Sequence, residues 1–154
     1  MKIETQRLEI IPCMNDSLQI LDRQNYDNGP EIRNYLEALA GDPTLLKWGH
    51  WLAIQKADGQ VIGDAGFKGK PNAEKEVEIG YGLLERYWNK GFATETVEAL
   101  IHWAFGTGEV KKVLAETEPD NAGSIRVLEK AGMQKTAETD SMIYWEITKG
   151  STQK

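Results

Sequence analysis

Side chains that bind metals or form disulfides are scarce in this chain of 154 residues. It has one cysteine, Cys13, and two histidines, His50 and His102. A single cysteine excludes an internal disulfide, and three such residues cannot build a cysteine–histidine metal cage. These counts do not exclude a metal site built from carboxylates alone, but the sequence predicts no metal cofactor.

Long hydrophobic runs and an excess of positive charge are also missing. No stretch approaches the roughly 18 consecutive apolar residues of a membrane helix, and residues 1–12 lack the pattern of a secretion signal. Asp and Glu number 24 against 18 Lys and Arg, giving a net charge of −6. This balance disfavours a surface that binds nucleic acid by neutralising phosphates. We therefore expect a cytoplasmic protein without nucleic-acid or membrane partners.

The composition is that of one globular unit. Hydrophobic residues make up 40% of the chain and charged residues 27%, which is ordinary for a folded domain. The length is about that of one domain, and repeats and low-complexity linkers are missing. We expect a single domain over residues 1–154.

Hydrophobic periodicity predicts an order of strands and helices. The Asp58-Gly59 pair indicates a hairpin between two of the strands. A meander followed by alternating strands and helices predicts an α+β fold, with one mixed, mostly antiparallel sheet of about six or seven strands flanked by about four helices. The predicted strands cover 7–12, 51–55, 61–67, 77–83, 112–118 and two segments within 133–148. The predicted helices cover 16–26, 30–46, 93–105 and 124–131. A turn is predicted over 25–30.

The turn before the longest helix has the features of an anion site. A helix N-terminus carries about four unpaired N–H groups and a partial positive charge, which favour phosphate. Gly91 and Ala93 leave space there, and Lys90 adds a cation. An ordinary strand-to-helix turn is the alternative interpretation. Neither a Walker motif nor a G-x-G-x-x-G motif is present.

A second motif follows the next predicted strand and completes a recognisable set. It reads Asn121-x-x-Ser124-x-x-x-Leu128-x-Lys130-x-Gly132. Together with Glu78-Ile79-Gly80-Tyr81 and Lys90-Gly91-Phe92-Ala93-Thr94-Glu95, it resembles the GNAT superfamily of N-acetyltransferases, in particular the RimJ/RimL-like branch. The resemblance runs from Thr5-Gln6-Arg7-Leu8 onward and is strong over residues 78–133.

The resemblance implies a GNAT-like fold and a site for acetyl-CoA. The loop from residue 88 would bind the pyrophosphate through the amides of residues 88–94, with Trp88 where the family usually has Gln or Arg. The pantetheine arm would lie between the strand of Gly80 and Gly82 and the strand over 113–117, which should splay apart, and Asn121 would lie near the thioester. The implied cofactor-binding residues are Gly80, Tyr81, Gly82, Leu83, Trp88, Asn89, Lys90, Gly91, Phe92, Ala93, Thr94, Asn121 and Ser124. The alternative roles are strand packing for the glycines and helix capping for Asn121.

The resemblance implies transfer of an acetyl group to an amine. This reaction needs a base, because an alkyl amine is mostly protonated at neutral pH. Glu78 is the preferred catalytic carboxylate and Glu116, on the partner strand, is the second candidate. Relatives often place a tyrosine seven residues after the asparagine, where this chain has Leu128, so Ser124 becomes the candidate proton donor, with helix capping as its alternative role. A backbone N–H near Tyr81 or Gly82 would stabilise the oxyanion. Cys13 has no histidine nearby in sequence, which favours direct transfer over an acyl-enzyme.

The acceptor is less defined than the donor. Trp48 and His50 are the candidate acceptor-binding residues, whereas Trp103 on the long helix is predicted to be core. The predicted function is transfer of an acetyl group from acetyl-CoA to a primary amine in a ternary complex, with a protein or peptide N-terminus among the implied acceptors. The alternatives are a small-molecule amine (a polyamine, an amino sugar or an amino acid), a non-catalytic acyl-CoA-binding module and a general nucleotide-phosphate binder. The protein would be a monomer, or a homodimer through its last strands.

Overall fold

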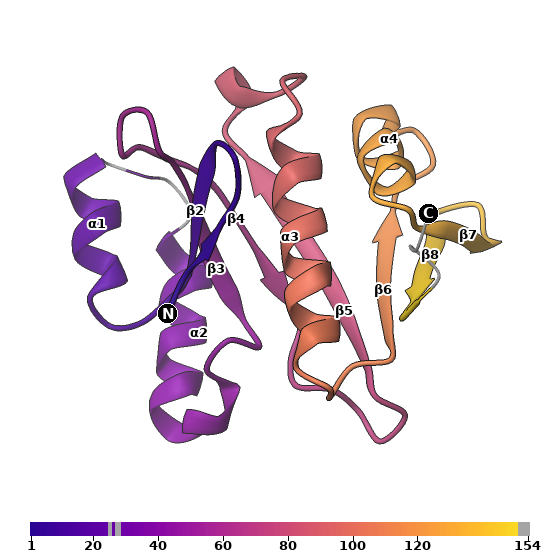
Figure 1. The fold of residues 1–154 in the computed structure, drawn as a ribbon, viewed down its shortest axis with the longest axis horizontal. Coiled ribbons are helices and arrows are strands. Elements are labelled where there is room, and N and C mark those ends of the chain that lie inside the picture. Colours follow the sequence, from indigo (N-terminus) through magenta and orange to yellow (C-terminus); the bar gives the residue numbers. More distant parts are fainter. Residues whose placement is uncertain (25, 27–28, 151–154) are drawn as a thin grey trace.

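The computed structural model describes residues 1–24, 26 and 29–150. Its strands form one eight-stranded sheet in the order β1-β2-β3-β4-β5-β6-β8-β7. In chain order (Figure 1) the elements are β1 (Ile3–Glu4), β2 (Leu8–Pro12), α1 (Ser17–Gln24), α2 (Gly29–Gly41), η1 (Pro43–Leu45), β3 (His50–Gln55), β4 (Val61–Phe67), β5 (Glu76–Leu83), η2 (Glu85–Tyr87), α3 (Phe92–Gly106), β6 (Lys112–Thr117), α4 (Ala122–Lys130), β7 (Gln134–Glu138) and β8 (Ile143–Thr148).

The α+β class and the mixed, mostly antiparallel sheet are confirmed. Only β5 and β6 pair in parallel, and all other neighbouring strands are antiparallel. The sheet has eight strands where about six or seven were predicted, and the two-residue strand β1 leaves no periodic pattern in the sequence. The helix expected over 30–46 ends at Gly41, because the Asp42 side chain caps the short 3-10 turn that starts at Pro43. The turn expected over 25–30 lies partly outside the described residues.

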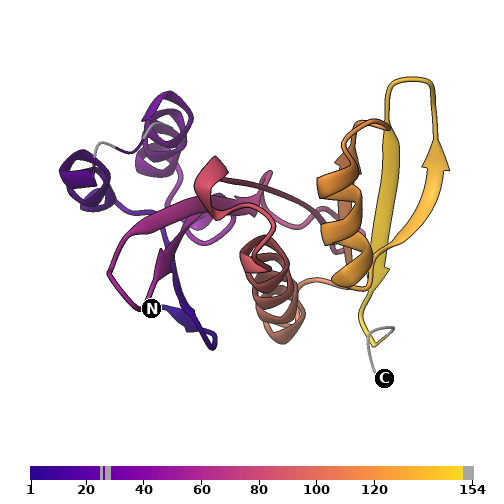
Figure 2. The same ribbon diagram turned by 90° about the horizontal axis from the view of Figure 1, so that it is seen from above.

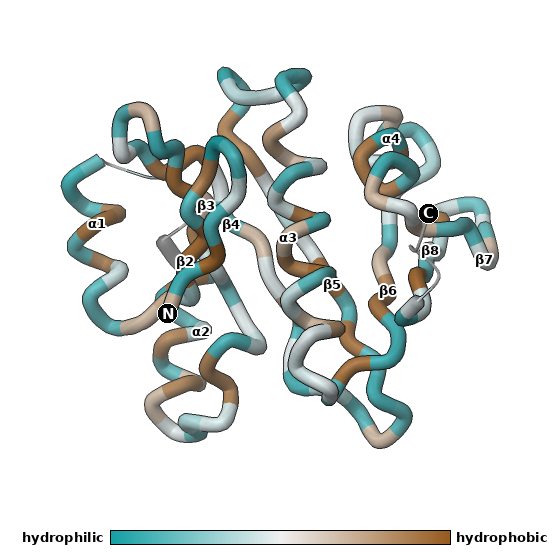
Figure 3. Tube along the Cα trace, in the orientation of Figure 1, coloured by the Kyte–Doolittle hydropathy of each residue, from teal (hydrophilic) through white to brown (hydrophobic). Residues whose placement is uncertain are grey.

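The helices cover both faces of the sheet, and each face has its own core. Figure 2 shows α1 and α2 on one face and α3 on the other. The larger core lies between the sheet and α3 and includes Trp51, Val97 and Leu100, whereas the smaller core includes Leu52 and Ile32. Successive residues of a strand point to opposite faces, so β3 contributes to both cores. Figure 3 shows hydrophobic residues recurring along α3 and along the central strands. None of the helices in the described part of the chain has the length and hydrophobicity needed to cross a membrane.

The two central strands diverge, and this divergence creates the space for the site. β5 and β6 pair only from Glu76 to Glu78, opposite Lys112 to Leu114. Beyond that point β5 continues along β4 as far as Leu83, while β6 continues along β8 as far as Thr117. The predicted splay is therefore confirmed. The chain then turns directly into η2 and α3, which brings the start of α3 close to the open end of the gap (Figure 1).

Candidate active site

The start of α3 presents unpaired amide groups. Gly91 is the N-cap residue with φ of 84°, in the left-handed region that favours glycine, and the first helical hydrogen bond runs from Glu95 N to Gly91 O at 3.0 Å. Among the described residues, nothing accepts a hydrogen bond from the amides of residues 91–94. The positive end of the helix dipole adds to these donors. The turn therefore suits a diphosphate such as that of coenzyme A.

Two of the predicted loop residues are placed differently. The Trp88 amide donates to Glu85 O at 3.0 Å within the 3-10 turn, so it is not available to a phosphate, and its indole donates to Leu83 O at 2.8 Å. Lys90 does not line the cavity at this turn. The cations that do line it are Arg126 and Lys130 from α4. Their spacing of four residues on one helix face was the available signal for them.

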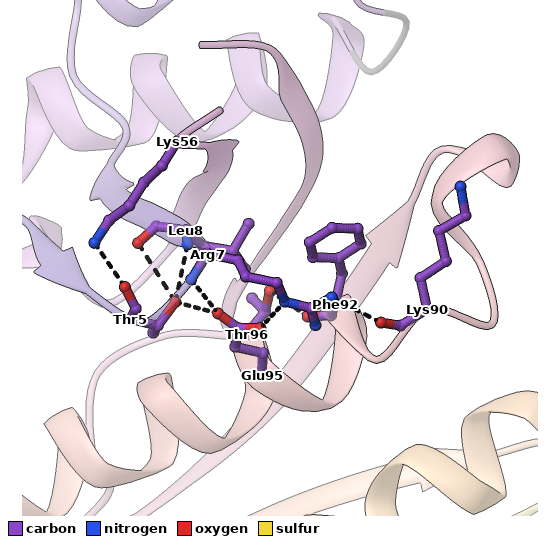
Figure 4. A network of polar contacts seen from close by, with 8 residues as sticks. All are labelled: Thr5, Arg7, Leu8, Lys56, Lys90, Phe92, Glu95 and Thr96. Atoms are coloured by element: carbon purple, nitrogen blue, oxygen red, sulfur yellow. Dashed lines mark hydrogen bonds and ion pairs between the residues drawn. The ribbon is translucent and has the colours of Figure 1, made fainter. Parts of the chain in front are cut away.

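A network from the turn between β1 and β2 holds the start of α3 in place (Figure 4). Arg7 Nε lies 2.7 Å from Glu95 Oε1, and the Arg7 guanidinium also donates to Lys90 O at 2.9 Å. The same guanidinium lies 4.0 Å from the centre of the Phe92 ring. Thr5 donates its hydroxyl hydrogen to Glu95. Arg7 therefore ties the N-terminal strands to both sides of the Gly91 cap.

Replacing Arg7 by alanine is expected to weaken both the fold and acetyl-CoA binding. Loss of a charged hydrogen-bond network of this kind costs about 2 kcal/mol of unfolding free energy. The loosened turn should raise the KM for acetyl-CoA about tenfold, the equivalent of about 1.4 kcal/mol, with a smaller effect on kcat. Denaturant unfolding and steady-state kinetics measure the two effects. Arg33→Ala, at an exposed arginine of α2, is the matched control, and equal effects from both variants would contradict the role of Arg7.

The same network makes part of the folding stability depend on pH. Burial raises the pKa of Glu95, but the hydrogen bonds from Thr5 and Arg7 together outweigh burial and hold the pKa below its ordinary value. A carboxylate with a lowered folded pKa stabilises the fold above its unfolded pKa of about 4.3, and this contribution is lost as the pH falls through the folded pKa. The stability difference between the wild type and Glu95→Gln should therefore be constant near neutral pH and shrink below about pH 4. Denaturant unfolding at several pH values measures this difference.

Two cavities meet where β5 and β6 diverge. One, of about 770 Å³, lies between the start of α3 and α4. The other, of about 780 Å³, opens over β3 and β4 beside Tyr26. They share five lining residues, namely Tyr81, Gly82, Leu83, Asn121 and Ser124. The two cavities are therefore contiguous at these residues.

The predicted helix motif is brought to this junction. Asn121 caps α4 by accepting a hydrogen bond from Ser124 N at 3.1 Å, so the capping role is present. Tyr81 donates its hydroxyl hydrogen to Ser124 O at 3.4 Å. Burial raises the pKa of Tyr81, and the hydrogen bond to Ser124 lowers it by a smaller amount. The pKa therefore lies above its ordinary value. Leu128 is buried on the wall of the cavity over β4 and carries no hydroxyl. Tyr81 and Ser124 therefore supply the hydroxyl groups at the junction.

Three other predicted site residues lie in different surroundings. Glu116 is exposed and lines the cavity over β4. Glu78 lies outside the lining of both cavities and forms an ion pair with Lys68 Nζ at 2.7 Å. Trp48 is 7% exposed and packs on Phe67 and Trp103 in the core against α3, so it does not reach the cavity. Trp103 belongs to the same aromatic group, as predicted.

A buried acid that the sequence analysis did not single out lies in the cavity over β4. Asp64 accepts a hydrogen bond from the Tyr26 hydroxyl at 2.8 Å, and its other oxygen lies 3.4 Å from His50 Nδ1. All three residues line the cavity, so the structure brings His50 to its wall. The available signal was the aspartate within the otherwise apolar segment Val61–Phe67.

Cys13 lies close to this acid, in surroundings that disfavour its thiolate. It is buried and free. Burial, and then the charge of Asp64, raise the pKa of the Cys13 thiol to about 12. The reactive form of cysteine is the thiolate, which this environment suppresses at neutral pH. The arrangement therefore favours direct transfer over an acyl-cysteine intermediate.

Comparison with known proteins identifies the family to which this fold belongs. The sequence profile of the Acetyltransferase (GNAT) domain matches residues 22–134. The uncharacterized N-acetyltransferase YjdG of Bacillus subtilis is 34% identical over 123 residues, which cover 78% of this chain and 73% of that protein. The chain therefore belongs to the GNAT acetyltransferase family, whose members use acetyl-CoA.

Two solved structures share the fold at low sequence identity. RimL, a ribosomal-protein α-N-acetyltransferase, superposes with a TM-score of 0.78 at 14% identity and covers 96% of this chain and 98% of that chain. RimJ of Mycobacterium smegmatis, in complex with CoA-disulfide, has a TM-score of 0.78 at 15% identity and covers 100% and 90%. At these identities the likeness concerns the fold.

Proposed function

We propose that this chain transfers the acetyl group of acetyl-CoA to a primary amine by direct attack within a ternary complex. The observation that carries the proposal is the pair of cavities that meet at Tyr81, Gly82, Leu83, Asn121 and Ser124. Each cavity suits one substrate. Their junction brings the two reactive groups together without a covalent enzyme intermediate.

The cavity between α3 and α4 suits the donor. The amides of residues 91–94 would bind the diphosphate, and Arg126 and Lys130 would add positive charge. The gap between β5 and β6 would take the extended arm. Acetyl-CoA supplies an activated acetyl group and a thiolate leaving group. The Tyr81 or Ser124 hydroxyl would donate a proton to that thiolate, and a backbone N–H of β5 would stabilise the oxyanion.

The cavity over β4 suits a cationic acceptor. Its lining includes the carboxylates of Glu31, Asp64, Glu116 and Glu118, against the single lysine Lys68. Such a surface attracts an ammonium group. The name of RimL, a protein α-N-acetyltransferase, makes a protein or peptide N-terminus the first acceptor to test, before a polyamine, an amino sugar or an amino acid.

An acceptor screen tests the proposal. Purified protein is incubated with acetyl-CoA and single amines from these classes, thiol release is measured, and mass spectrometry identifies the acetylated product. We expect turnover of at least one primary amine, with both substrates required before product forms. Tight coenzyme A binding without turnover of any amine would instead indicate a non-catalytic acyl-CoA-binding module.

A further inference from the structure

The sheet face below the acceptor cavity is arranged in two rows that end at the gap. In one row Asp64 on β4 pairs with Gly82 on β5, and in the next His50 on β3 pairs with Gly66, which pairs with Gly80. Paired residues of neighbouring strands point to the same face. His50 and Asp64 therefore share a face with Gly80 and Gly82, at the edge where β5 leaves β6.

The two glycines on β5 keep this face open. A Cβ atom at Gly82 would meet nothing within 4 Å, and one at Gly80 would meet only Lys68 Cε at 3.6 Å. Neither glycine has a positive φ. Backbone conformation and close packing therefore do not require glycine at these positions. Their lack of side chains instead leaves an unobstructed floor between His50, Asp64 and the junction of the two cavities.

The side chains at the edge of this floor form a chain of polar contacts. Tyr26 donates to Asp64 Oδ2 at 2.8 Å, and Asp64 Oδ1 lies 3.4 Å from His50 Nδ1. Burial, with the charge of Asp64 and the hydrogen bond to it, raises the pKa of Tyr26, so the hydroxyl stays protonated and remains a donor. A carboxylate at Nδ1 of a histidine fixes the tautomer in which Nε2 can accept a proton. Tyr26 and Asp64 would thus orient His50 as a base.

We propose that His50 is the general base of this enzyme, with Asp64 and Tyr26 as positioning residues, and that the acceptor ammonium lies on the floor formed by Gly80 and Gly82. This inference rests on the proposed function. One proton passes from the acceptor ammonium to His50 Nε2. The amine lone pair then forms the C–N bond with the thioester carbonyl carbon, the C–S bond breaks, and the second proton lost by nitrogen ends on the thiolate or in solvent.

The two carboxylates predicted from the sequence, Glu78 and Glu116, are less suitable as the general base than His50. The Glu78 side chain is held by Lys68 and lies outside the cavity lining. Glu116 is exposed on β6. A base also works best when its pKa lies near the working pH, and imidazole is the side chain whose ordinary pKa comes closest. His50 combines this chemistry with a place on the cavity wall.

The test compares His50→Gln with the wild type, using an acceptor found in the screen. General-base catalysis contributes about 10²-fold to 10⁴-fold, so kcat/KM for the amine should fall at least about a hundredfold at pH 7. The wild-type rate should level off well below the pKa of the amine, whereas the variant rate should rise about tenfold per pH unit up to it, because the variant uses only neutral amine. Among the described residues, the other titratable or charged groups that line this cavity or contact His50 are Asp64, Tyr26, Tyr35, Cys13, Glu31, Lys68, Tyr81, Glu116 and Glu118.

Further variants separate catalysis from folding. Asp64→Asn should lower kcat about tenfold or more and lose the same plateau, because an amide no longer fixes the tautomer. The affinity for coenzyme A, measured by calorimetry, and the melting temperature should stay at wild-type values in His50→Gln. His102→Gln, at an exposed histidine of α3, is the matched control and should behave as the wild type.

The outcomes distinguish this inference from the proposed function. Wild-type kinetics and a wild-type pH profile in His50→Gln would overturn the inference while leaving the acetyltransferase intact. A large loss in Glu78→Gln together with no loss in His50→Gln would assign the base to Glu78. Failure of the wild-type protein to acetylate any amine would instead remove the proposed function.

Discussion

Replacing Ala93 by aspartate is expected to weaken coenzyme A binding strongly without weakening the fold. Ala93 is the second residue of α3 and lines the cavity at the start of that helix. A carboxylate there would lie beside a diphosphate bound at this turn, and two like charges about 5 Å apart repel by about 3 kcal/mol at an effective dielectric constant of 20. The dissociation constant should therefore rise more than about a hundredfold.

The Ala93→Asp variant should be slightly more stable than the wild type. An acidic residue in the first turn of a helix interacts favourably with the helix dipole, by about 0.3–1 kcal/mol. Calorimetric titration with coenzyme A and a thermal melt therefore give separate readings. Ala93→Ser, which keeps the size and adds no charge, should bind nearly as the wild type. If the aspartate variant bound coenzyme A within about threefold of the wild type, the diphosphate would not lie at this turn.

The parts of this site that follow from local sequence were predictable. The stripe of apolar residues on α3 and the glycine at its cap fix the helix and the turn before it, because they depend on 3.6-residue periodicity and on one left-handed residue. The Asn121 cap and the start of α4 follow in the same way. The splay of β5 from β6 was expected only through the family resemblance, since no local pattern encodes it.

The parts that depend on strand register were not predictable. Whether Asp64 lies opposite Gly82 depends on the pairing of two strands, and a shift of one residue would turn Asp64 to the other face. Trp48 was expected at the pocket because it precedes β3, but its place in the chain did not reveal its packing on Trp103, 55 positions further on. The contact of Arg7 with Glu95, 88 residues apart, was hidden for the same reason.

Trp51→Ala is expected to lower the free energy of unfolding more than the other substitutions proposed above. The Trp51 side chain is fully buried in the core against α3, and its ring lies 5.0 Å from that of Trp103 in an edge-on arrangement. Truncation of a buried tryptophan leaves a large cavity and costs about 3–5 kcal/mol. For a chain of this length that loss corresponds to a drop of about 10 °C in melting temperature. Differential scanning calorimetry measures it, with Trp88→Ala, at an exposed tryptophan, as the control that should melt within about 2 °C of the wild type.

A comparison of Trp51→Ala with His50→Gln tests whether the two faces of β3 act independently. The two residues are adjacent, but Trp51 points to the core against α3 and His50 to the cavity over β4. Well below its melting temperature, Trp51→Ala should keep the pH profile of the wild type, and its activity should fall only with the folded fraction as it is warmed. His50→Gln should show the reverse, with a normal melt and a lost plateau. Loss of the plateau in both variants would mean that packing on the α3 face sets the position of the imidazole, and the two faces would then not be independent.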